Sequence, residues 1–555
     1  MKYETRKQSL TSSQVMVTSN HPLASSVGLS ILAAGGNAFD AASGTAFALS
    51  VVEPMMVGPF GGGFTNFYIP NQGFFTIDGY ASAPGKSSET MFNPVEFEDG
   101  PSGLFEVEDK LNQNGYLAVA TPGNLQVWSH LVEKFGKFSL KDVISPAIQI
   151  ARNGFQVSDY LSNNIRDNFT ELSKHSESSS IYLPNGDIPQ KGDIIKNPNF
   201  ALVLEGIANN GSAYLYEGEL GQHVEDEMLD NGGLLSLDDL RRQKFFYRNP
   251  VIGTYKDFQI HSVGPVSSGG ICLIQMLNIL ENFDLQKYSI TDPQRIHILS
   301  EVFKIVFADR YEYIGDPEYV KIPVEGLISK KYALERSKEI NLHRAQSYEF
   351  THNFKLNDSE NTTHFNVADS EGNIVSMTQT INNAFGSKVA LKGTGMLLNN
   401  CMELFDPNPG MANSIHPYKR CLSSMTPTII TKGTKPYLVL GTPGGRKIFG
   451  AVAQALLALT NNGLSLQASV EAPRIWTDGG VLELEYEFDE NVKTSLASLG
   501  HQVSSVNRVA GGLNAIMFEN ELMIGAACHR ADGSPSGLSG GYAMPSKPGD
   551  AFRDY

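Results

Sequence analysis

Several stretches of the chain repeat apolar residues at helical spacing, and residues typical of helix ends stand beside them. Residues 22–34 run up to the pair Gly35–Gly36, which is a typical helix end. Asn37 precedes the apolar run 38–52, so we expect it to cap a second helix, which Pro54 follows. Further helices are predicted at 122–135, 139–152, 267–282, 292–309 and 447–459.

From residue 363 onward the pattern changes to the two-residue alternation of β-strands. Segments 363–368 and 374–381 flank the turn-rich sequence Ser370–Asn373, which predicts a β-hairpin whose first residue pairs with Thr380. By period two, one face of the second strand is polar and the other apolar. The polar face carries Ser376, Thr378, Thr380 and Asn382, and the apolar face carries Val375, Met377 and Ile381. We therefore expect hydroxyls and an amide beside Thr362, with a core contact behind them.

Thr362 follows a polar segment without clean periodicity, residues 343–361, which we interpret as a long loop. A threonine hydroxyl is a weak nucleophile, but a threonine at a free N-terminus can use its own α-amine as a base, with a reference pKa of ~7.7–8.0. An internal threonine gains that amine only when the preceding peptide bond is cut. A Thr-Thr pair that starts a strand more often reflects β-propensity alone, so this hypothesis needs support from other residues.

Two other segments carry groups that can bind a reacting substrate. Gly444 and Gly445 stand between a strand-like run and a predicted helix, where backbone N–H groups can hold a developing oxyanion. Ser423 and Ser424 precede an apolar strand and can donate hydrogen bonds to a carboxylate or carbonyl group. Each pattern alone is more typical of a ligand-free turn. The glycine run 58–63 lacks the lysine of a phosphate-binding loop, so we interpret it as structural.

Taken together, these segments resemble the γ-glutamyltransferase family of N-terminal nucleophile hydrolases. The nucleophile segment follows the family signature at nearly every position: Thr362-Thr363-His364, Glu371-Gly372-Asn373, Thr378-Gln379-Thr380-Ile381-Asn382 and Phe385-Gly386. Asn366 departs from the signature, since Ser or Thr is usual there. The similarity covers nearly the whole chain, through segments 34–42, 52–54, 61–63, 120–123, 265–270 and 397–400.

The resemblance implies an α+β fold, built as a four-layer αββα sandwich. It also implies self-cleavage at Asn361–Thr362, so that residues 1–361 and 362–555 become a large and a small fragment that associate as one intertwined unit. The substrate would be a small-molecule amide or peptide such as glutathione, and a homodimer is compatible with the family. No metal or organic cofactor is required, because the amine and hydroxyl of Thr362 supply base and nucleophile.

The resemblance also assigns roles to individual residues. Thr362 takes the role of the nucleophile in both self-cleavage and catalysis. Thr363 and Thr380 would support the nucleophile, and Asn382 would contact the nucleophile and the acyl group. Ser423 and Ser424 would bind a substrate α-carboxylate, and Gly444 and Gly445 would form the oxyanion hole. His364 is expected to orient the hairpin rather than to act as a base.

Departures from the family pattern concern the substrate. Tyr80 stands where the family has an arginine that binds the γ-glutamyl α-carboxylate, and a phenol cannot form a bidentate charged pair. Leu404 replaces the aspartate that binds the α-amine, and Cys401 replaces a polar neighbour. Glu403 is one position away and would face the opposite side if this segment were a strand. We place these four residues at the substrate site and expect altered specificity.

Composition narrows the class of protein further. The chain has 59 acidic and 43 basic residues, a net charge of −16 and no cluster of Lys and Arg, which argues against a nucleic-acid partner. Its four cysteines lack metal-binding spacing. No window reaches ~18 uninterrupted apolar residues, so we expect no membrane span. The N-terminal residues lack the apolar core of a secretory signal, so we expect a cytoplasmic enzyme.

Three hypotheses about function remain open from the sequence. The first is a self-processing amidase that prefers an acyl group other than γ-glutamyl, such as the glutaryl group of cephalosporin acylase substrates or a small amide acid. The second is a γ-glutamyl hydrolase or transferase whose binding groups come from elsewhere in the chain. The third is an unprocessed, non-catalytic binding protein. The presence of the complete set of catalytic residues implied above argues against the third hypothesis.

Overall fold

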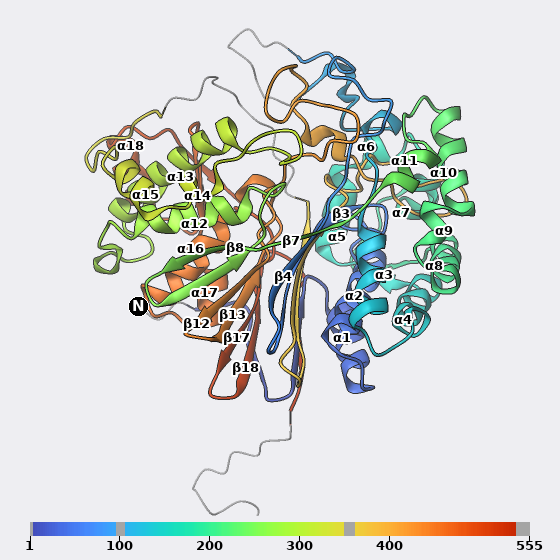
Figure 1. Ribbon diagram of the computed structural model, residues 1–555, viewed down its shortest axis with the longest axis horizontal. Coiled ribbons are helices and arrows are strands. Elements are labelled where there is room, and N and C mark those ends of the chain that lie inside the picture. The colour runs from blue at the N-terminus through green and yellow to red at the C-terminus, as the bar shows by residue number, and fades with distance from the viewer. Residues whose placement is uncertain (1–3, 96–105, 349–360, 540–555) are drawn as a thin grey trace, which may run out of the picture.

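The computed structural model describes residues 4–95, 106–348 and 361–539. In these residues, two seven-stranded antiparallel sheets lie face to face, and helices cover the outer face of each (Figure 1). This arrangement confirms the predicted four-layer αββα sandwich. Most of the predicted loop at 343–361 lies outside the described residues.

Both sheets combine strands from either side of residue 361. In spatial order, the first sheet contains β1 (Leu10–Ser12), β18 (Leu522–Ala527), β17 (Asn514–Glu519), β13 (Lys435–Gly441), β12 (Thr428–Lys432), β9 (Phe258–Ser262) and β8 (Val251–Tyr255). The second contains β19 (Ser534–Leu538), β2 (Val15–Ser19), β10 (Thr363–Ala368), β11 (Ile374–Thr380), β3 (Gly62–Ile69), β4 (Gly73–Gly79) and β7 (Phe246–Arg248). The chain before and after residue 361 is therefore one folded unit.

Two helical layers bury the outer faces of the sheets. Over the second sheet lie α1 (Pro22–Ala33), α2 (Ala38–Val52), α3 (Asn124–Phe135), α4 (Leu140–Asn153) and α8 (Pro198–Asn210), with the shorter helices α5 (Asp159–Asp167), α6 (Phe169–Leu172), α7 (Ser176–Tyr182), α9 (Ala213–Tyr216), α10 (Glu219–Asp230) and α11 (Leu237–Arg242) on the same side. Over the first sheet lie α12 (Gly269–Leu280), α13 (Pro293–Tyr313), α14 (Val324–Leu327), α15 (Lys330–Ser337), α16 (Ile448–Thr460), α17 (Leu466–Glu471) and α18 (Glu490–Ser498). Smaller strands pair as β5 (Phe155–Gln156) with β6 (Ile194–Ile195), and as β14 (Ile475–Trp476), β15 (Leu482–Glu485) and β16 (Val503–Val506).

The predicted helices are present, with shifts of a few residues at their ends. The strongest local signal is at α2, where the Asn37 side chain accepts hydrogen bonds from the backbone N–H groups of Phe39 and Asp40, and Asp40 accepts one from Asn37 N. This reciprocal capping box satisfies donors that the helix itself cannot. At α13 the helix continues to Tyr313, four residues past the predicted end, and its buried residues extend to Arg310. That extension places Arg310 within the helix.

The hairpin β10–β11 forms with a register one residue from the predicted one. Thr363 pairs with Gln379, not Thr380, and Ala368 pairs with Ile374. The loop has one more residue than expected, because Asp369 leaves the strand and its Oδ1 atom accepts hydrogen bonds from the backbone N–H groups of Glu371 and Asn373. This Asx-type closure competes with a ladder pair. Continuing the observed register places Thr362 opposite Thr380, so the predicted proximity to the nucleophile holds.

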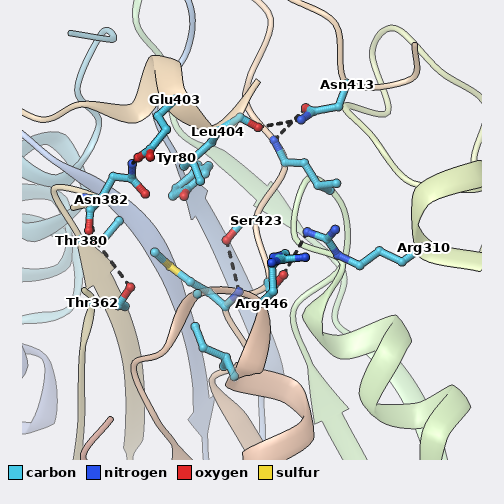
Figure 2. Close-up of a pocket in the computed structure, with 15 residues that line it drawn as sticks. Tyr80, Arg310, Thr362, Thr380, Asn382, Glu403, Leu404, Asn413, Ser423 and Arg446 are labelled. Carbon is cyan, nitrogen blue, oxygen red and sulfur yellow. Dashed lines mark hydrogen bonds between the residues drawn. The ribbon is translucent and has the colours of Figure 1, made fainter. Parts of the chain in front are cut away.

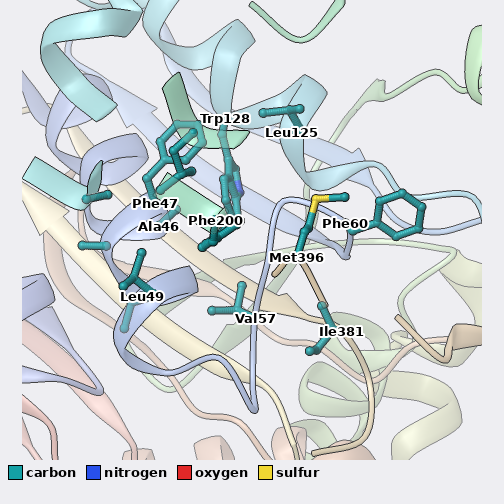
Figure 3. Close-up of a cluster of buried hydrophobic side chains, with 14 of the residues drawn as sticks. Ala46, Phe47, Leu49, Val57, Phe60, Leu125, Trp128, Phe200, Ile381 and Met396 are labelled. Carbon is teal, nitrogen blue, oxygen red and sulfur yellow. The ribbon is translucent and has the colours of Figure 1, made fainter. Parts of the chain in front are cut away.

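Behind the hairpin lies the core between the second sheet and its helices. Phe47 and Trp128 pack edge to face with ring centroids 5.1 Å apart in this cluster (Figure 3). The Trp128 indole N–H donates to Gln379 Oε1 at 3.1 Å, so its one polar atom is satisfied. Met377 and Ile381 of the hairpin segment are buried in the same cluster, as the alternation predicts. The hairpin is thus fixed from behind by apolar packing.

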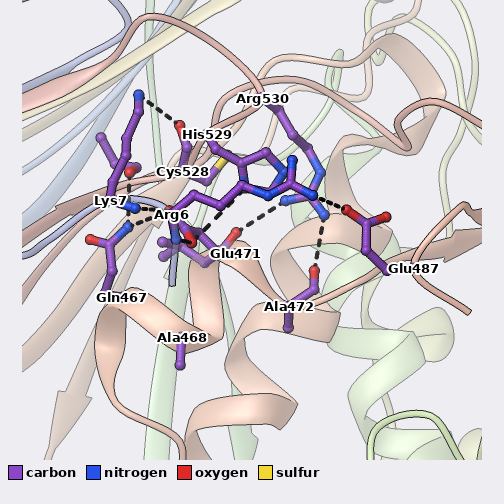
Figure 4. Close-up of polar contacts among 12 residues, drawn as sticks. Arg6, Lys7, Gln467, Ala468, Glu471, Ala472, Glu487, Cys528, His529 and Arg530 are labelled. Carbon is purple, nitrogen blue, oxygen red and sulfur yellow. Dashed lines mark hydrogen bonds and ion pairs between the residues drawn. The ribbon is translucent and has the colours of Figure 1, made fainter. Parts of the chain in front are cut away.

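The N-terminal segment is fastened to the far end of the chain (Figure 4). The Glu471 carboxylate of α17 accepts hydrogen bonds from the backbone N–H groups of Arg6 and Lys7, at 2.6 and 3.0 Å. Lys7 Nζ donates to the carbonyls of Cys528, Ala531 and Gly533. These contacts join the first described residues to the segment that enters β19. Within the described part of the chain, no helix is both long and apolar enough to cross a membrane.

Candidate active site

A pocket of about 60 Å³ gathers residues from both sides of residue 361 (Figure 2). Most of the sequence-predicted site residues line it: Tyr80, Thr362, Thr380, Asn382, Glu403, Leu404, Ser423, Ser424 and Gly445. Three polar residues that the sequence analysis did not single out line it too: Arg310, Asn413 and Arg446. Cys401, Thr363 and Gly444 are not among the lining residues. The fold therefore brings the predicted groups together around one small cavity.

Thr362 and Thr380 face each other across the start of the hairpin. Thr362 Oγ1 lies 3.5 Å from Thr380 Oγ1, and Thr362 is 4% exposed. Thr380 Oγ1 in turn donates to the carbonyl oxygen of Asn361 at 2.6 Å and accepts from the backbone N–H of Asn382 at 2.8 Å. A donor on that carbonyl oxygen polarises the peptide bond between Asn361 and Thr362. The hydroxyl groups of Thr362 and Thr380 therefore meet at the same peptide bond.

The Asn382 amide has its orientation set by Glu403. Asn382 Nδ2 donates to Glu403 Oε2 at 2.7 Å and to the Asn400 carbonyl at 3.2 Å. Both partners of the amide nitrogen are acceptor oxygens, so the amide nitrogen faces Glu403 and the amide oxygen faces the other way. The backbone of Asn382 has φ of +76°, a left-handed conformation that asparagine tolerates better than most residues. The turn after β11 thus presents an oriented amide to the pocket.

Glu403 and Leu404 both line the pocket, which corrects the strand-based expectation for Glu403. Residues Cys401–Leu404 form a short 3₁₀-helix, η5, instead of a strand. Consecutive residues of a 3₁₀-helix are about 120° apart, so two neighbours can border the same cavity, whereas in a strand they face opposite sides. A carboxylate therefore stands beside the apolar side chain that replaces the family aspartate.

Tyr80 and Cys401 occupy one apolar cluster at the back of the pocket. Tyr80 is 3% exposed, lines the pocket and stacks at a tilt on Phe64, with ring centroids 5.2 Å apart. Burial raises the pKa of the Tyr80 phenol well above its usual value, so it stays neutral. Cys401 is fully buried in the same cluster beside Cys421, behind the lining residues. Contrary to the expectation from the sequence, Cys401 does not line the substrate pocket but lies behind its wall, because η5 turns the side chain toward the apolar cluster.

Ser423 and Ser424 enter the pocket on a segment held by buried charges. Arg420 just before them pairs with Asp78 and with Asp316, the latter at 2.6 Å, and its backbone N–H donates to Asp316 Oδ2. All three of these charged side chains are buried. A buried ion pair with several hydrogen bonds costs much to break, so it fixes the backbone that follows. The serine pair is therefore held in a defined position.

Gly444 and Gly445 form the turn between β13 and α16 and need the freedom of glycine. Gly444 has φ of +139° and Gly445 φ of +54°. A Cβ atom on Gly444 would lie 2.6 Å from the Ala510 Cβ atom, closer than real contacts allow. The short 3₁₀ turn Gly445–Lys447 then leads into α16, so backbone N–H groups of a helix start lie beside the cavity. This arrangement suits the stabilisation of a negative oxygen.

Thr363 follows Thr362 in the chain and contacts a buried acid, Glu53, to which the sequence patterns assign no role. Thr363 Oγ1 donates to Glu53 Oε2 at 2.5 Å. Full burial raises the pKa of Glu53 to about 8, so its carboxyl group holds a proton at neutral pH. His364 contacts Thr378 and Asn366 through its two ring nitrogens, and burial lowers its pKa to about 3. An imidazole with so low a pKa is a weak base, and the two contacts of its ring are to side chains of the hairpin, as expected for a group that orients the hairpin.

One group of side chains has the types that bind metals, and it lies outside the pocket. In the described residues, His297, Glu301 and His501 come together within 4.8 Å of one another. Their atoms already have protein partners: His297 Nδ1 contacts His501 Nε2 at 2.8 Å, and Glu301 Oε1 accepts from Lys304 Nζ at 2.7 Å. We interpret the group as a hydrogen-bonded network that holds α13 in place.

The fold and the site define a class of protein: a hydroxyl nucleophile at the start of a central strand in an αββα sandwich is the arrangement of the N-terminal nucleophile hydrolases. The sequence model of the gamma-glutamyltranspeptidase family matches residues 24–538. The chain belongs to this family, and it is an enzyme.

Relatives in the family carry two kinds of name. The chain is 44% identical over 538 residues to the acylase ACY 1 proenzyme of Pseudomonas sp. (strain V22), covering 97% of this chain and 96% of the relative. It is 36% identical over 520 residues to the glutathione hydrolase proenzyme of Escherichia coli (strain K12), covering 91% and 88%. Among solved structures, a cephalosporin acylase from Bacillus halodurans superposes with a TM-score of 0.86 at 26% identity, covering 97% of this chain and 98% of that one.

Proposed function

We propose that the chain cuts itself between Asn361 and Thr362 and then hydrolyses an acyl amide through an ester on Thr362. The hydrogen bond from Thr380 Oγ1 to the Asn361 carbonyl, at 2.6 Å, carries this proposal. It holds a donor where negative charge develops when Thr362 Oγ1 attacks that carbonyl carbon. The names of the relatives as proenzymes give independent support.

Self-cleavage would proceed by an acyl shift at this bond. Thr362 Oγ1 forms a bond to the Asn361 carbonyl carbon, the C–N bond breaks, and the Thr362 nitrogen takes the hydroxyl proton to become an amine. Water then hydrolyses the resulting ester and releases the new N-terminus. The products are residues 1–361 and 362–555, of about 39 and about 21 kDa in proportion to length. Because each sheet takes strands from both, the fragments would stay together.

In turnover the Thr362 α-amine would act as the base and its hydroxyl as the nucleophile toward a substrate amide. The backbone N–H groups at Gly444 and Gly445 would stabilise the oxyanion, with Asn382 contacting the nucleophile or the acyl group. Thr363 would support Thr362 from behind through its bond to Glu53. The ester formed on Thr362 is resolved by water.

The pocket favours an acyl group that has a distal carboxylate and no α-amine. The serine pair that would bind the carboxylate is present, while Leu404 stands where the family has the amine-binding aspartate. A γ-glutamyl group without its amine is a glutaryl group, so a glutaryl-type amide is the substrate class that we propose. The names acylase and cephalosporin acylase among the similar proteins point the same way.

A γ-glutamyl amide is the second candidate, and one observation favours it. The Glu403 carboxylate lines the pocket beside Leu404, so a negative group is close to where an α-amine would lie. Glu403 is already engaged with the amides of Asn382 and Asn400, which weakens this alternative.

The first test is the intact mass of the purified protein, with N-terminal sequencing of any smaller fragment. We expect two fragments, the smaller beginning at Thr362, and turnover of glutaryl p-nitroanilide in preference to γ-glutamyl p-nitroanilide. The Thr362→Ala variant should keep the full-length mass and lose at least ~10⁴-fold in kcat, because both nucleophile and base are removed. A processed and active alanine variant, or a wild-type chain that stays whole on prolonged incubation, would contradict the proposal.

A further inference from the structure

Arg310 of α13 points toward the serine pair from the helical layer over the first sheet (Figure 2). Its Nη2 atom donates to Ser424 Oγ at 3.0 Å, and its Nε atom donates to Ser268 Oγ at 2.9 Å. Both serines are buried, and Arg310 is 5% exposed. A guanidinium in this position brings a permanent positive charge to the wall of the pocket.

The hydroxyl protons at this wall can be assigned from their partners. Ser268 Oγ donates to the Ser423 carbonyl at 2.7 Å, so its single proton is already used. Ser424 Oγ receives the Arg310 proton as an acceptor, which leaves its own O–H to be directed elsewhere. Its contact with Ser268 Oγ is at 3.5 Å, the limit for a hydrogen bond. The Ser424 hydroxyl is therefore able to donate into the pocket.

The Ser423 oxygen, like that of Ser424, accepts a hydrogen bond from the protein. Its donor is the backbone N–H of Met425, at 3.2 Å. The Ser423 hydroxyl also has the Tyr80 phenol as a hydrogen-bond partner, so the Ser424 proton is the donor of the pair that the Arg310 contact directs toward a ligand. An O–H donor backed by a guanidinium suits a carboxylate oxygen. A neutral alkyl chain would gain nothing from it.

A second arginine at the pocket differs in its partner. Arg446 Nη1 donates to Asp478 Oδ2 at 2.7 Å and to the Tyr311 hydroxyl at 2.8 Å. Neither of these two contacts reaches the serine pair, whereas Arg310 Nη2 donates directly to Ser424 Oγ. A substrate carboxylate held by the serine pair is therefore expected to depend on Arg310 rather than on Arg446.

We propose that Arg310 determines the preference for a carboxylate-bearing acyl group, as a positioning residue that acts through the Ser424 hydroxyl. Arg310 would supply the positive charge that an arginine supplies in the family at the position of Tyr80, whose phenol is neutral. The inference rests on the proposed function and names the chemical feature that the same site recognises.

The test compares two anilide substrates of equal chain length on the processed enzyme, glutaryl and pentanoyl p-nitroanilide. In Arg310→Lys the charge remains but the fork that reaches both serines is lost. We expect KM for the glutaryl substrate to rise roughly 10- to 100-fold with kcat within about 3-fold, and kcat/KM for the pentanoyl substrate to stay the same. Ser424→Ala should give the same selective loss. The double variant should add little to either single variant, because the two residues act as one unit.

Arg295→Lys is the matched control, since Arg295 is buried on the same helix and donates to the Leu285 carbonyl, away from the pocket. Arg295→Lys should leave KM and kcat for both substrates unchanged. An equal fall of kcat/KM for both substrates in Arg310→Lys would mean that Arg310 has a purely structural role. A change in the preference for the glutaryl substrate with Arg446→Lys alone would assign the role to Arg446. Either result overturns the proposal.

Binding of 5-oxohexanoate against 2-hexanone, measured by calorimetry, needs neither processing nor turnover, because these two ketones cannot be hydrolysed and only the first carries a carboxylate. We expect wild-type protein to favour 5-oxohexanoate and Ser424→Ala to lose that preference at an unchanged melting temperature. This measurement keeps the inference testable if Arg310→Lys does not fold. A chain without fragments or turnover would contradict the proposed function, whereas an active enzyme with no preference for 5-oxohexanoate over 2-hexanone would contradict only the inference.

Discussion

At the scale of single residues, the site depends on which hydroxyl holds which proton. Thr380 Oγ1 has four hydrogen-bond contacts, and its shortest contact as donor is to the Asn361 carbonyl at 2.6 Å, against 3.4 Å to the Asn382 carbonyl. The backbone N–H of Asn382 fills an acceptor site on the same oxygen, which directs the Thr380 proton toward that carbonyl. The hydroxyl that was expected to support the nucleophile therefore also acts on the bond that precedes it.

This contact predicts the effect of removing the Thr380 hydroxyl. Thr380→Val keeps the shape but not the donor, so self-cleavage should slow by roughly 10²–10³-fold, as for the loss of an oxyanion donor. Thr380→Ser keeps the hydroxyl and should process within about 10-fold of wild type. The rate is read from fragment appearance on a denaturing gel after purification of the uncut chain. Equal processing in Thr380→Val and wild type would show that the hydrogen bond plays no part.

At the scale of elements, short segments decide which side chains reach the cavity. The 3₁₀-helix η5 (Cys401–Leu404) sends Glu403 and Leu404 to the pocket and Cys401 to the apolar cluster behind it. A strand at the same place would have separated Glu403 from Leu404. Similarly, the one-residue longer loop of the β10–β11 hairpin sets Thr362 opposite Thr380. The conformation of an element, more than its composition, thus fixes the site.

Element η5 leads to a prediction about substrate choice. Leu404 lines the pocket and is partly exposed, so Leu404→Asp can carry a charge without full burial. A charge-assisted bond to an α-amine is worth ~1.5–3 kcal/mol, so the ratio of kcat/KM for γ-glutamyl over glutaryl p-nitroanilide should rise roughly 10- to 100-fold. Leu404→Asn, of similar shape but neutral, should change this ratio much less. The same ratio in both variants would show that the family aspartate position does not govern specificity here.

At the scale of the whole molecule, one αββα sandwich is closed by residues from distant parts of the chain. Each sheet takes strands from both sides of residue 361, and Arg6 and Lys7 are fastened to Glu471 of α17. The buried Glu53 belongs to this scale as well, because it joins the C-terminal end of α2 to β10 through Thr363. Its burial couples stability to pH.

Because the pKa of the buried Glu53 carboxyl group is raised, we expect the free energy of unfolding to fall as pH rises. Its pKa is about 8 in the folded protein against the ordinary 4.5, so between these values the folded chain holds a proton that the unfolded chain releases. For this group, stability is highest below about pH 4.5, falls as pH rises toward about 8, and then levels off. Glu53→Gln mimics the protonated acid and should flatten the fall. Denaturant midpoints between pH 5 and 9, in a Thr362→Ala background that keeps the chain whole, measure this slope.

The exposed Glu490→Gln serves as the control, since it removes a carboxylate at the surface and should leave the slope unchanged. A Glu53→Gln variant with the wild-type slope would show that Glu53 does not titrate in this range.

Much of the local structure followed from the sequence, because periodicity and capping act within a few residues. The helix α2 and its Asn37 cap, the alternation of polar and apolar residues in β11, and the glycine turn at Gly444–Gly445 all depend on neighbours in the chain. The hairpin register was wrong by one residue because Asp369 could pair in the ladder or close the loop, and sequence spacing does not separate these outcomes.

Sequence alone thus determined the family, the layered fold that the family implies, and most of the residues that line the pocket, since these are carried by contiguous segments. Only the tertiary structure decided which distant groups meet. Arg310 and Ser424 are 114 residues apart, and Thr363 and Glu53 are 310 residues apart, yet each pair shares a hydrogen bond. The packing of whole layers sets such contacts, because a residue's partners across the core depend on how sheets and helices stack, and no local pattern records that.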